Sequence, residues 1–371
     1  MNKSNKTILG TAAAVLYLLA VLPVLGVAAE VIFKGDVTYL DKDTLSLEKK
    51  FESAFKTFKQ GKKFDAYFTG YIYVSRHDIR FGNEGTSGEP YKLYTEKDKI
   101  KIRRTRAKGY SMTSDTGEKD QSPTGVILLH SAANGEILDS SHIDLEETFT
   151  VEDYPLYWFG EADNEESFKF LTKEFEKSDF SIQDEFVFLI GAHVHPQAVE
   201  FLRKVALGTY PSKTREQAIF WLGSNKYDKS LEYLKDIFKK EDSSKMREKV
   251  IFSFYLIGNE AAVKELIHIA KNDENSKVRK QSIFWLGQKA TEESVKALKA
   301  VVDDTDEDTQ VKQSAVFALS QLPKDRSVPM LIEIARSNDN PKVRENAIFW
   351  LGQKDDKAAL KFFEEILLKK K

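Results

Sequence analysis

The sequence has no cysteine, and its Lys and Arg residues (56) nearly equal its Asp and Glu residues (58). Without cysteine, disulfides, thiolate nucleophiles and zinc–thiolate sites are excluded, so packing alone must stabilise the fold. Without a basic excess, the composition does not predict a nucleic-acid partner. At 371 residues the chain is long enough for two domains.

The N-terminal segment has the organisation of a secretory signal peptide. Lys3 and Lys6 precede a long apolar run that ends in small residues at 27–29. We therefore predict that residues 1–29 are a signal peptide and that the protein is periplasmic or secreted. The apolar run is also long enough to span a bilayer, so an uncleaved membrane anchor is the alternative. Contact with a membrane is expected only in that case.

Residues 30–180 change pattern often and predict a small α+β domain with an antiparallel sheet. Leu47, Phe51, Phe55 and Phe58 recur at helical spacing and predict a helix that stops near Gly61. Strand-like runs follow, two of them joined at Asn134-Gly135, a favoured hairpin turn. The expected elements are strands at 65–74, 99–106, 125–131 and 136–149 and a closing helix at 164–177.

One unit is repeated over residues 181–371, at a period of about 32 residues. The clearest copies are REQAIFWLG from Arg215, RKQSIFWLG from Arg279 and RENAIFWLG from Arg344; weaker copies start at Gln183, Arg247 and Lys312. An amphipathic helix lies between successive copies, so each unit has two helices. Such units bury their apolar faces against their neighbours, which predicts an α-solenoid.

Residues at both ends of the repeated helices resemble helix caps. Ser243, Asn275, Asp308 and Asn340 stand four positions before the basic start of a copy and are expected N-caps. Glycines near the end of the copies are expected left-handed C-caps: Gly191, Gly223, Gly287 and Gly352. We expect the basic starting residues to form ion pairs between repeats, with acidic partners such as Asp242, Asp273, Asp306 and Asp339.

The segment Asn340-Pro341-Lys342-Val343-Arg344, followed by Ala347, Leu351 and Gly352, resembles the HEAT repeat of the short bacterial, phycobilin-lyase-like type. The Ile-Phe-Trp-Leu-Gly form of the copies resembles exported bacterial HEAT-repeat proteins. The resemblance covers about residues 183–371. It implies a mainly α fold, an α/α superhelix of about six helical hairpins, with second helices lining the concave surface. It implies a scaffold, not a lyase. Looser packing is expected where the copies depart from the pattern, at Ser253, Tyr255, Ala318 and Ser320.

Every copy has phenylalanine at its sixth residue, on the helix face opposite the expected core. We call this side of the second helices the Phe face. Its residues are Phe188, Phe220, Phe252, Phe284, Phe317 and Phe349, flanked by the amides Gln217, Gln281, Gln288, Gln321 and Gln353. Three interpretations stay open: a groove for an extended peptide or glycan, packing of each ring between repeats, or cover by the N-terminal domain.

No motif predicts catalysis, a metal site or a cofactor. The His193-x-His195 pair lacks a third ligand, and 304–308 lacks the later residues of a calcium loop. The glycines at 82, 85 and 88 are followed by no phosphate-binding helix. The sequence also lacks the His-Glu pairs in which the HEAT-type deoxyhypusine hydroxylases resemble one another.

The sequence therefore predicts a non-catalytic scaffold that binds a protein or extended peptide on the concave Phe face. The alternative is a ligand sensor or hydrolase in the N-terminal domain, with His77, Asp78 or His130 converging in a cleft, positioned by the solenoid. A structural envelope component without a discrete ligand is a third possibility.

Overall fold

The computed structural model describes residues 31–40, 45–61, 64–75, 91–97, 99–103, 122–143, 145, 148–225 and 227–368. The predicted signal peptide, His77, Asp78 and the glycines at 82–88 lie outside these residues. The chain divides into two compact units. The N-terminal domain comprises residues 1–178 with 193–195, and the helical array comprises 179–192 with 196–371.

The N-terminal domain contains two mixed sheets. One has the order β1 (Ile32–Lys34), β8 (Thr148–Val151), β4 (Tyr91–Glu96), β5 (Lys99–Arg103); the other has the order β2 (Val37–Tyr39), β9 (Leu156–Glu161), β3 (Ala66–Ser75), β6 (Ser122–Ser131), β7 (Ile137–Ile143). β8 is parallel to β1 and β4, and β9 is parallel to β2 and β3. The expected sheet region is present, but its pairing is not purely antiparallel. Side-chain alternation is the same for both directions, so the sequence pattern could not distinguish them.

Strand β3 is buried on both of its faces. Phe68 and Ile72 belong to the apolar core that also contains Leu93 and Phe149 of the four-stranded sheet. On the opposite face Tyr67 and Tyr71 contact two helices, α1 (Leu47–Gly61) and α2 (Asn164–Lys177). Both helices begin where the sequence predicts. The predicted turn at Asn134-Gly135 joins β6 to β7, and Gly135 has a φ of +77°.

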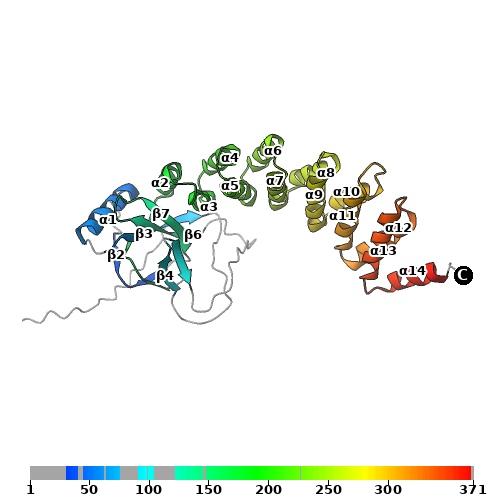
Figure 1. Ribbon diagram of the computed structural model, residues 1–371, viewed down its shortest axis with the longest axis horizontal. Coiled ribbons are helices and arrows are strands. Elements are labelled where there is room, and N and C mark those ends of the chain that lie inside the picture. The colour runs from blue at the N-terminus through cyan, green and yellow to red at the C-terminus, as the bar shows by residue number, and fades with distance from the viewer. Residues whose placement is uncertain are drawn as a thin grey trace, which may run out of the picture. The chain divides into compact units, whose positions relative to one another are not determined.

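The helical array is the expected α-solenoid. Within the described residues it consists of α3 (Gln183–Ala192), α4 (Ala198–Leu207), α5 (Ser212–Ser224), α6 (Ser230–Lys240), α7 (Ser244–Ile257), α8 (Glu260–Asn272), α9 (Ser276–Lys289), α10 (Glu292–Asp303), α11 (Thr309–Ser320), α12 (Lys324–Ser337), α13 (Pro341–Gly352) and α14 (Lys357–Leu368). The odd-numbered helices are the repeated second helices, and each packs against the next one. Figure 1 shows them side by side along the inner edge of the curved array, with the even-numbered helices along its outer edge.

The expected core and N-caps are confirmed. Ala218, Ile219 and Leu222 are fully buried in α5, and Ala347 and Leu351 are fully buried in α13. The side chains of the four predicted N-cap residues accept hydrogen bonds from backbone N–H groups of the first helical turn: Ser243, Asn275, Asp308 and Asn340. These caps fix the start of each second helix.

The glycines near the helix ends are not left-handed caps. Gly191, Gly223 and Gly287 lie inside their helices, and the left-handed glycine of the array is instead Gly258, with a φ of +64°. A Cβ on Gly191 would lie 2.5 Å from Cγ of Trp221 in the next repeat, and one on Gly223 would lie 2.6 Å from Cβ of Ser253. Gly191, Gly223 and Gly287 are therefore required because neighbouring second helices approach each other closely. Gly352, the last residue of α13, is neither left-handed nor in such a close contact.

The copies that depart from the pattern are not loosely packed. Ser253 is fully buried, and its Oγ donates a hydrogen bond to the carbonyl oxygen of Ile219, at 2.8 Å. Ala318 is also buried and fits against Gly287. A glycine in the preceding repeat lets the two helices approach closely, and the small side chains of Ser253 and Ala318 fit in the narrow space between them. The expected loosening is therefore wrong at these two positions.

Ion pairs between repeats are present, with some partners other than those expected. Arg247 pairs with Asp273 as expected, whereas Arg215 pairs with Glu241. Arg279 donates to both carboxylate oxygens of Glu307, at 2.7 and 2.9 Å. Each acidic partner lies just before the next second helix. These ion pairs therefore stabilise the packing of each repeat on the next.

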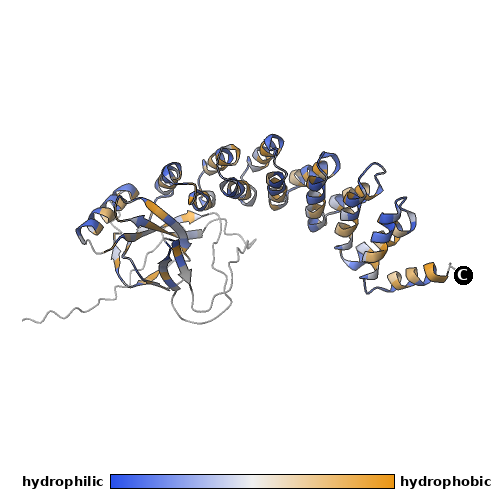
Figure 2. Cartoon of the chain, viewed as in Figure 1, coloured by the Kyte–Doolittle hydropathy of each residue, from blue (hydrophilic) through white to orange (hydrophobic). Residues whose placement is uncertain are grey.

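The last helix, α14, has no second helix after it within the described residues. Figure 2 shows it as a largely hydrophobic segment, and Leu360 and Leu367 are 60% and 70% exposed. In the preceding first helix, α12, the apolar residues Val328, Leu331 and Ile334 are buried. Among the described helices, none has both the length and the apolar character needed to cross a bilayer.

Candidate functional site

The Phe face retains exposed aromatic surface in every repeat. Phe188, Phe220, Phe252 and Phe317 are half-buried. Phe284 and Phe349 are more open, at 38% and 56% exposed. By comparison, the next residue of the α5 copy, Trp221, is fully buried. The helix position opposite the core thus holds six rings that the array itself does not cover completely.

Contacts between repeats explain which rings are half-buried. Phe188 contacts Trp221, Phe252 contacts Trp285 and Phe317 contacts Trp350, with ring centroids 4.8–5.2 Å apart. Phe220 instead stacks on Phe252 at 6.4 Å. In each case the partner ring comes from the next repeat. Packing between repeats and an open aromatic surface therefore coexist on this face.

The two most exposed rings are those without a partner ring in the next repeat. Phe284 is followed one repeat later by Ala318, at a position where three other repeats have tryptophan. Phe349 belongs to α13, which no further second helix follows within the described residues. The C-terminal part of the Phe face is therefore its most accessible apolar surface.

The predicted amides lie beside these rings with free hydrogen-bonding groups. Gln217 and Gln281 are half-buried, whereas Gln288, Gln321 and Gln353 are exposed. Gln321 donates to Oγ of Ser320 at 3.0 Å. The other four side-chain amides make no hydrogen bond to the part of the chain that the structure describes. They can therefore bond a partner without breaking internal contacts.

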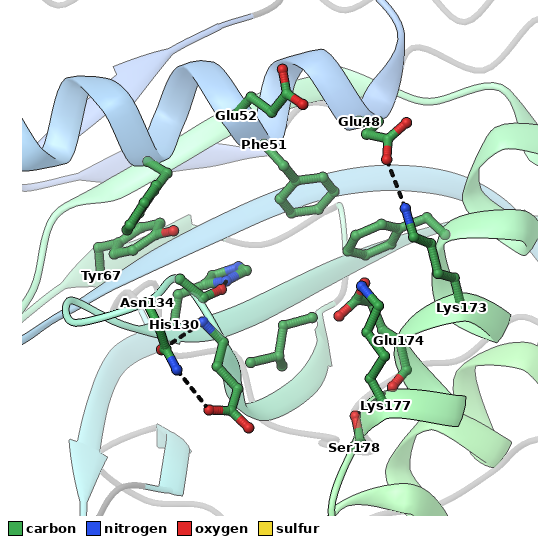
Figure 3. A pocket seen from close by; sticks show the side chains of 15 residues that line it. Glu48, Phe51, Glu52, Tyr67, His130, Asn134, Lys173, Glu174, Lys177 and Ser178 are labelled. Carbon is green, nitrogen blue, oxygen red and sulfur yellow. Dashed lines mark hydrogen bonds and ion pairs between the residues drawn. The ribbon is translucent and has the colours of Figure 1, made fainter.

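The N-terminal domain contains a pocket of about 450 Å³ between α1, α2 and the β6–β7 hairpin. We call it the α1–α2 pocket; Figure 3 shows its side chains. Its aromatic lining is Phe51, Phe55, Tyr67, His130 and Phe170, and its charged lining is Glu48, Glu52, Glu136, Lys173, Glu174 and Lys177. These residues come from elements far apart in the sequence. Sequence reasoning missed the pocket, except for naming His130.

His130 lies on the floor of this pocket but is held inward. Its Nδ1 donates to the carbonyl oxygen of Gly135 at 3.0 Å, so its Nε2 accepts from the Thr69 hydroxyl at 2.8 Å. Its ring stacks on Tyr67, with centroids 4.8 Å apart. Burial lowers the pKa of His130 to about 4. The imidazole is therefore neutral and forms part of the pocket floor. Its two nitrogens bond Thr69 and Gly135 rather than an acidic side chain, so the arrangement expected for a hydrolase is not present at this histidine.

Tyr67 brings a buried hydroxyl to the pocket. The residue is 2% exposed, and burial raises the pKa of its phenol, so the hydroxyl keeps its proton. It makes no hydrogen bond to the described residues. Figure 3 shows this hydroxyl on the pocket side of the ring. The hydroxyl is therefore available to bond a group in the pocket.

The rim of the pocket has more carboxylates than ammonium groups. Glu48 pairs with Lys173 and Glu174 pairs with Lys177, each at 2.7 Å. Glu52 and Glu136 make no ion pair to any residue the structure describes. Glu136 accepts one hydrogen bond from the Asn134 side chain, at 3.0 Å. The unpaired charge at the rim is therefore negative.

The other residues weighed from the sequence have structural roles. His193 stacks on Tyr73 with centroids 3.9 Å apart, and His195 stacks on Phe168 at 3.8 Å. Asp308 caps α11. Across the described residues, no group of three or more His, Asp or Glu side chains could hold a metal ion.

Comparisons with known proteins bear on the helical array. The solved structures that the chain resembles include the following two. Human deoxyhypusine hydroxylase in complex with glycerol is 18% identical, with 54% of this chain and 77% of that chain covered and a TM-score of 0.25. The complex of CpcE and CpcF of phycocyanin lyase from a Nostoc species is 17% identical, with 52% and 77% covered and a TM-score of 0.33.

The chain matches no curated protein. Residues 263–340 match the family model of HEAT repeats, which spans α9 to α12 and parts of the adjoining repeats. Over these residues the repeat type expected from the sequence is confirmed, and the helical array is a repeat solenoid that contains HEAT repeats.

Proposed function

We propose that this is an exported, non-catalytic scaffold whose helical array binds an extended segment of a partner protein along the Phe face. The observation that carries the proposal is the line of six incompletely buried phenylalanines, with Phe284 and Phe349 open to solvent. An ordered row of exposed apolar rings marks an interaction surface more often than a chance pattern.

The spacing of the repeats favours an extended peptide. Packed helices lie roughly 8–10 Å apart, so successive rings of the Phe face recur at about that interval. An extended polyproline II chain advances about 9 Å in three residues. A peptide with an apolar residue at every third position would therefore place one side chain on each repeat. The free amides beside the rings would bond its backbone.

Binding to selected peptides tests the proposal. Peptides from a display library are selected on the full chain, and the affinity of one labelled peptide is measured by fluorescence anisotropy. We expect apolar residues at every third position. We also expect Phe284→Ala and Phe349→Ala each to weaken binding about tenfold, the effect of losing an aromatic anchor.

The control variant is Lys296→Ala, which removes an exposed side chain from α10. It should bind like the parent chain. Equal binding by Phe284→Ala, with an unchanged helical circular dichroism spectrum, would refute the Phe face as the site. Export is tested separately: an intact mass that begins at Glu30 supports a cleaved signal peptide, and a retained N-terminus supports an anchor.

A further inference from the structure

The α1–α2 pocket has the size and lining of a small-molecule site. Its volume of about 450 Å³ lies within the usual range of such sites, roughly 300–1,000 Å³. Phe51 and Phe170 stack at 4.2 Å, Tyr67 and His130 stack at 4.8 Å, and Phe51 lies 5.8 Å from His130, so these rings form one continuous aromatic wall. Phe51, Phe55 and Phe170 are half-buried, so this wall offers an apolar surface against which an apolar or aromatic body can pack.

The charges that line the pocket determine which sign of charge its ligand can carry. Four carboxylates and two ammonium groups line it, so Glu52 and Glu136 are left after the two ion pairs have formed. Lys59, outside the lining, lies 5.2 Å from the centroid of Phe55 and donates to the carbonyl oxygen of Ala133. Even with Lys59 counted, carboxylates exceed ammonium groups.

The floor adds no positive charge and supplies one acceptor. His130 is neutral, and both of its ring nitrogens are bonded within the domain. The Tyr67 hydroxyl can accept a hydrogen bond from a ligand N–H group. The aromatic faces also attract cations, because the face of an aromatic ring is electronegative. Aromatic walls, a free acceptor and two unpaired carboxylates all favour the same chemistry.

We propose that the α1–α2 pocket binds a small organic ammonium ion with an apolar or aromatic body. The body lies against the half-buried rings of Phe51, Phe55 and Phe170, with Tyr67 and His130 at the floor of the pocket. The ammonium group lies toward Glu52 and Glu136 and donates to the Tyr67 hydroxyl. This site does not involve the Phe face, so either proposal can be refuted without affecting the other.

Three probes of nearly equal shape test the proposal on the full chain. They are 2-phenylethylammonium, the neutral 2-phenylethanol and the anionic 3-phenylpropionate, and binding is measured by ligand-observed NMR titration. We expect the cation to bind about tenfold more tightly than the alcohol, because it gains ion-pair and cation–π interactions. The anion should bind least. Equal affinities for all three, or no binding of the cation, would overturn the proposal.

Substitutions locate the site. Glu136→Gln and Glu52→Gln should each weaken the cation about threefold and leave the alcohol unchanged. Tyr67→Phe keeps the ring but removes the hydroxyl, and should weaken the cation by a similar factor. Glu232→Gln, on α6 of the helical array, is the control for net charge and should bind like the parent chain. Unchanged cation binding by Glu136→Gln, Glu52→Gln and Tyr67→Phe would place the ligand elsewhere and refute the assignment.

Discussion

Alanine at position 223 is expected to destabilise the helical array, although alanine is the better helix former. A Cβ there would lie 2.6 Å from Cβ, 2.7 Å from Cα and 2.9 Å from the carbonyl oxygen of Ser253. Two of these three atoms are backbone, so no rotamer change can relieve the clash. Helix α5 or α7 must move instead.

The expected size follows from two opposing effects. Overpacking a close contact costs about 1–3 kcal/mol, and a clash with backbone belongs to the upper part of that range. Replacing glycine inside a helix gains about 1 kcal/mol. Gly223→Ala should therefore lower the free energy of unfolding by about 1–2 kcal/mol.

Gly352→Ala is the matched control. At Gly352 the nearest atom to a Cβ is Cζ of Phe363, at 3.8 Å, so the substitution meets no clash. It should raise the free energy of unfolding by about 0.5 kcal/mol. Urea midpoints of the helical far-ultraviolet signal compare the two variants. If Gly223→Ala were as stable as Gly352→Ala, close approach of the helices would not be the reason for the glycine.

Two further predictions concern charge. Burial lowers the pKa of His130 from 6.5 to about 4, so the unfolded chain binds more protons between these values. The contribution of His130 to stability should therefore be complete above about pH 6.5 and fall by up to about 3 kcal/mol as the pH drops to 4. His130→Gln should make the urea midpoint less dependent on pH; an unchanged slope would contradict this. Arg279→Met should cost about 2–4 kcal/mol, because it leaves the buried carboxylate of Glu307 unpaired (15% and 7% side-chain exposure). Arg336→Met breaks a pair with Glu365 that is 51% and 39% exposed and should cost under about 1 kcal/mol. Thermal unfolding compares the two arginine variants, and equal losses would mean that burial does not determine the strength of these pairs.

The solenoid could be predicted from sequence because its signals are local. Period, apolar spacing and N-cap residues all lie within one unit, and the core at Ala218, Ile219 and Leu222 follows from helical geometry alone. The misread glycines show the limit of that reasoning. Gly223 suits a helix end and a close contact equally well, and the distinction depends on Ser253, one repeat later.

The α1–α2 pocket could not be predicted for a similar reason. Its walls come from two helices and a hairpin that are far apart in the sequence; the ion pair between Glu48 and Lys173 joins residues 125 positions apart. No motif within one segment marks such a site. The exposure of Phe284 likewise depends on Ala318 in the next repeat, whereas the residue type at the Phe face is visible in every copy.

The strand order of the N-terminal domain has a consequence for how the chain folds. The strands that complete its sheets come late: β8 lies between β1 and β4, and β9 lies between β2 and β3. The four-stranded sheet cannot be completed until residue 151 has left the ribosome, and the five-stranded sheet cannot be completed until residue 161 has done so. The earlier strands keep unpaired edges until then. Each solenoid repeat can instead pack on the repeat before it. The domain made first should therefore be the slower to fold, since its contacts span more of the chain.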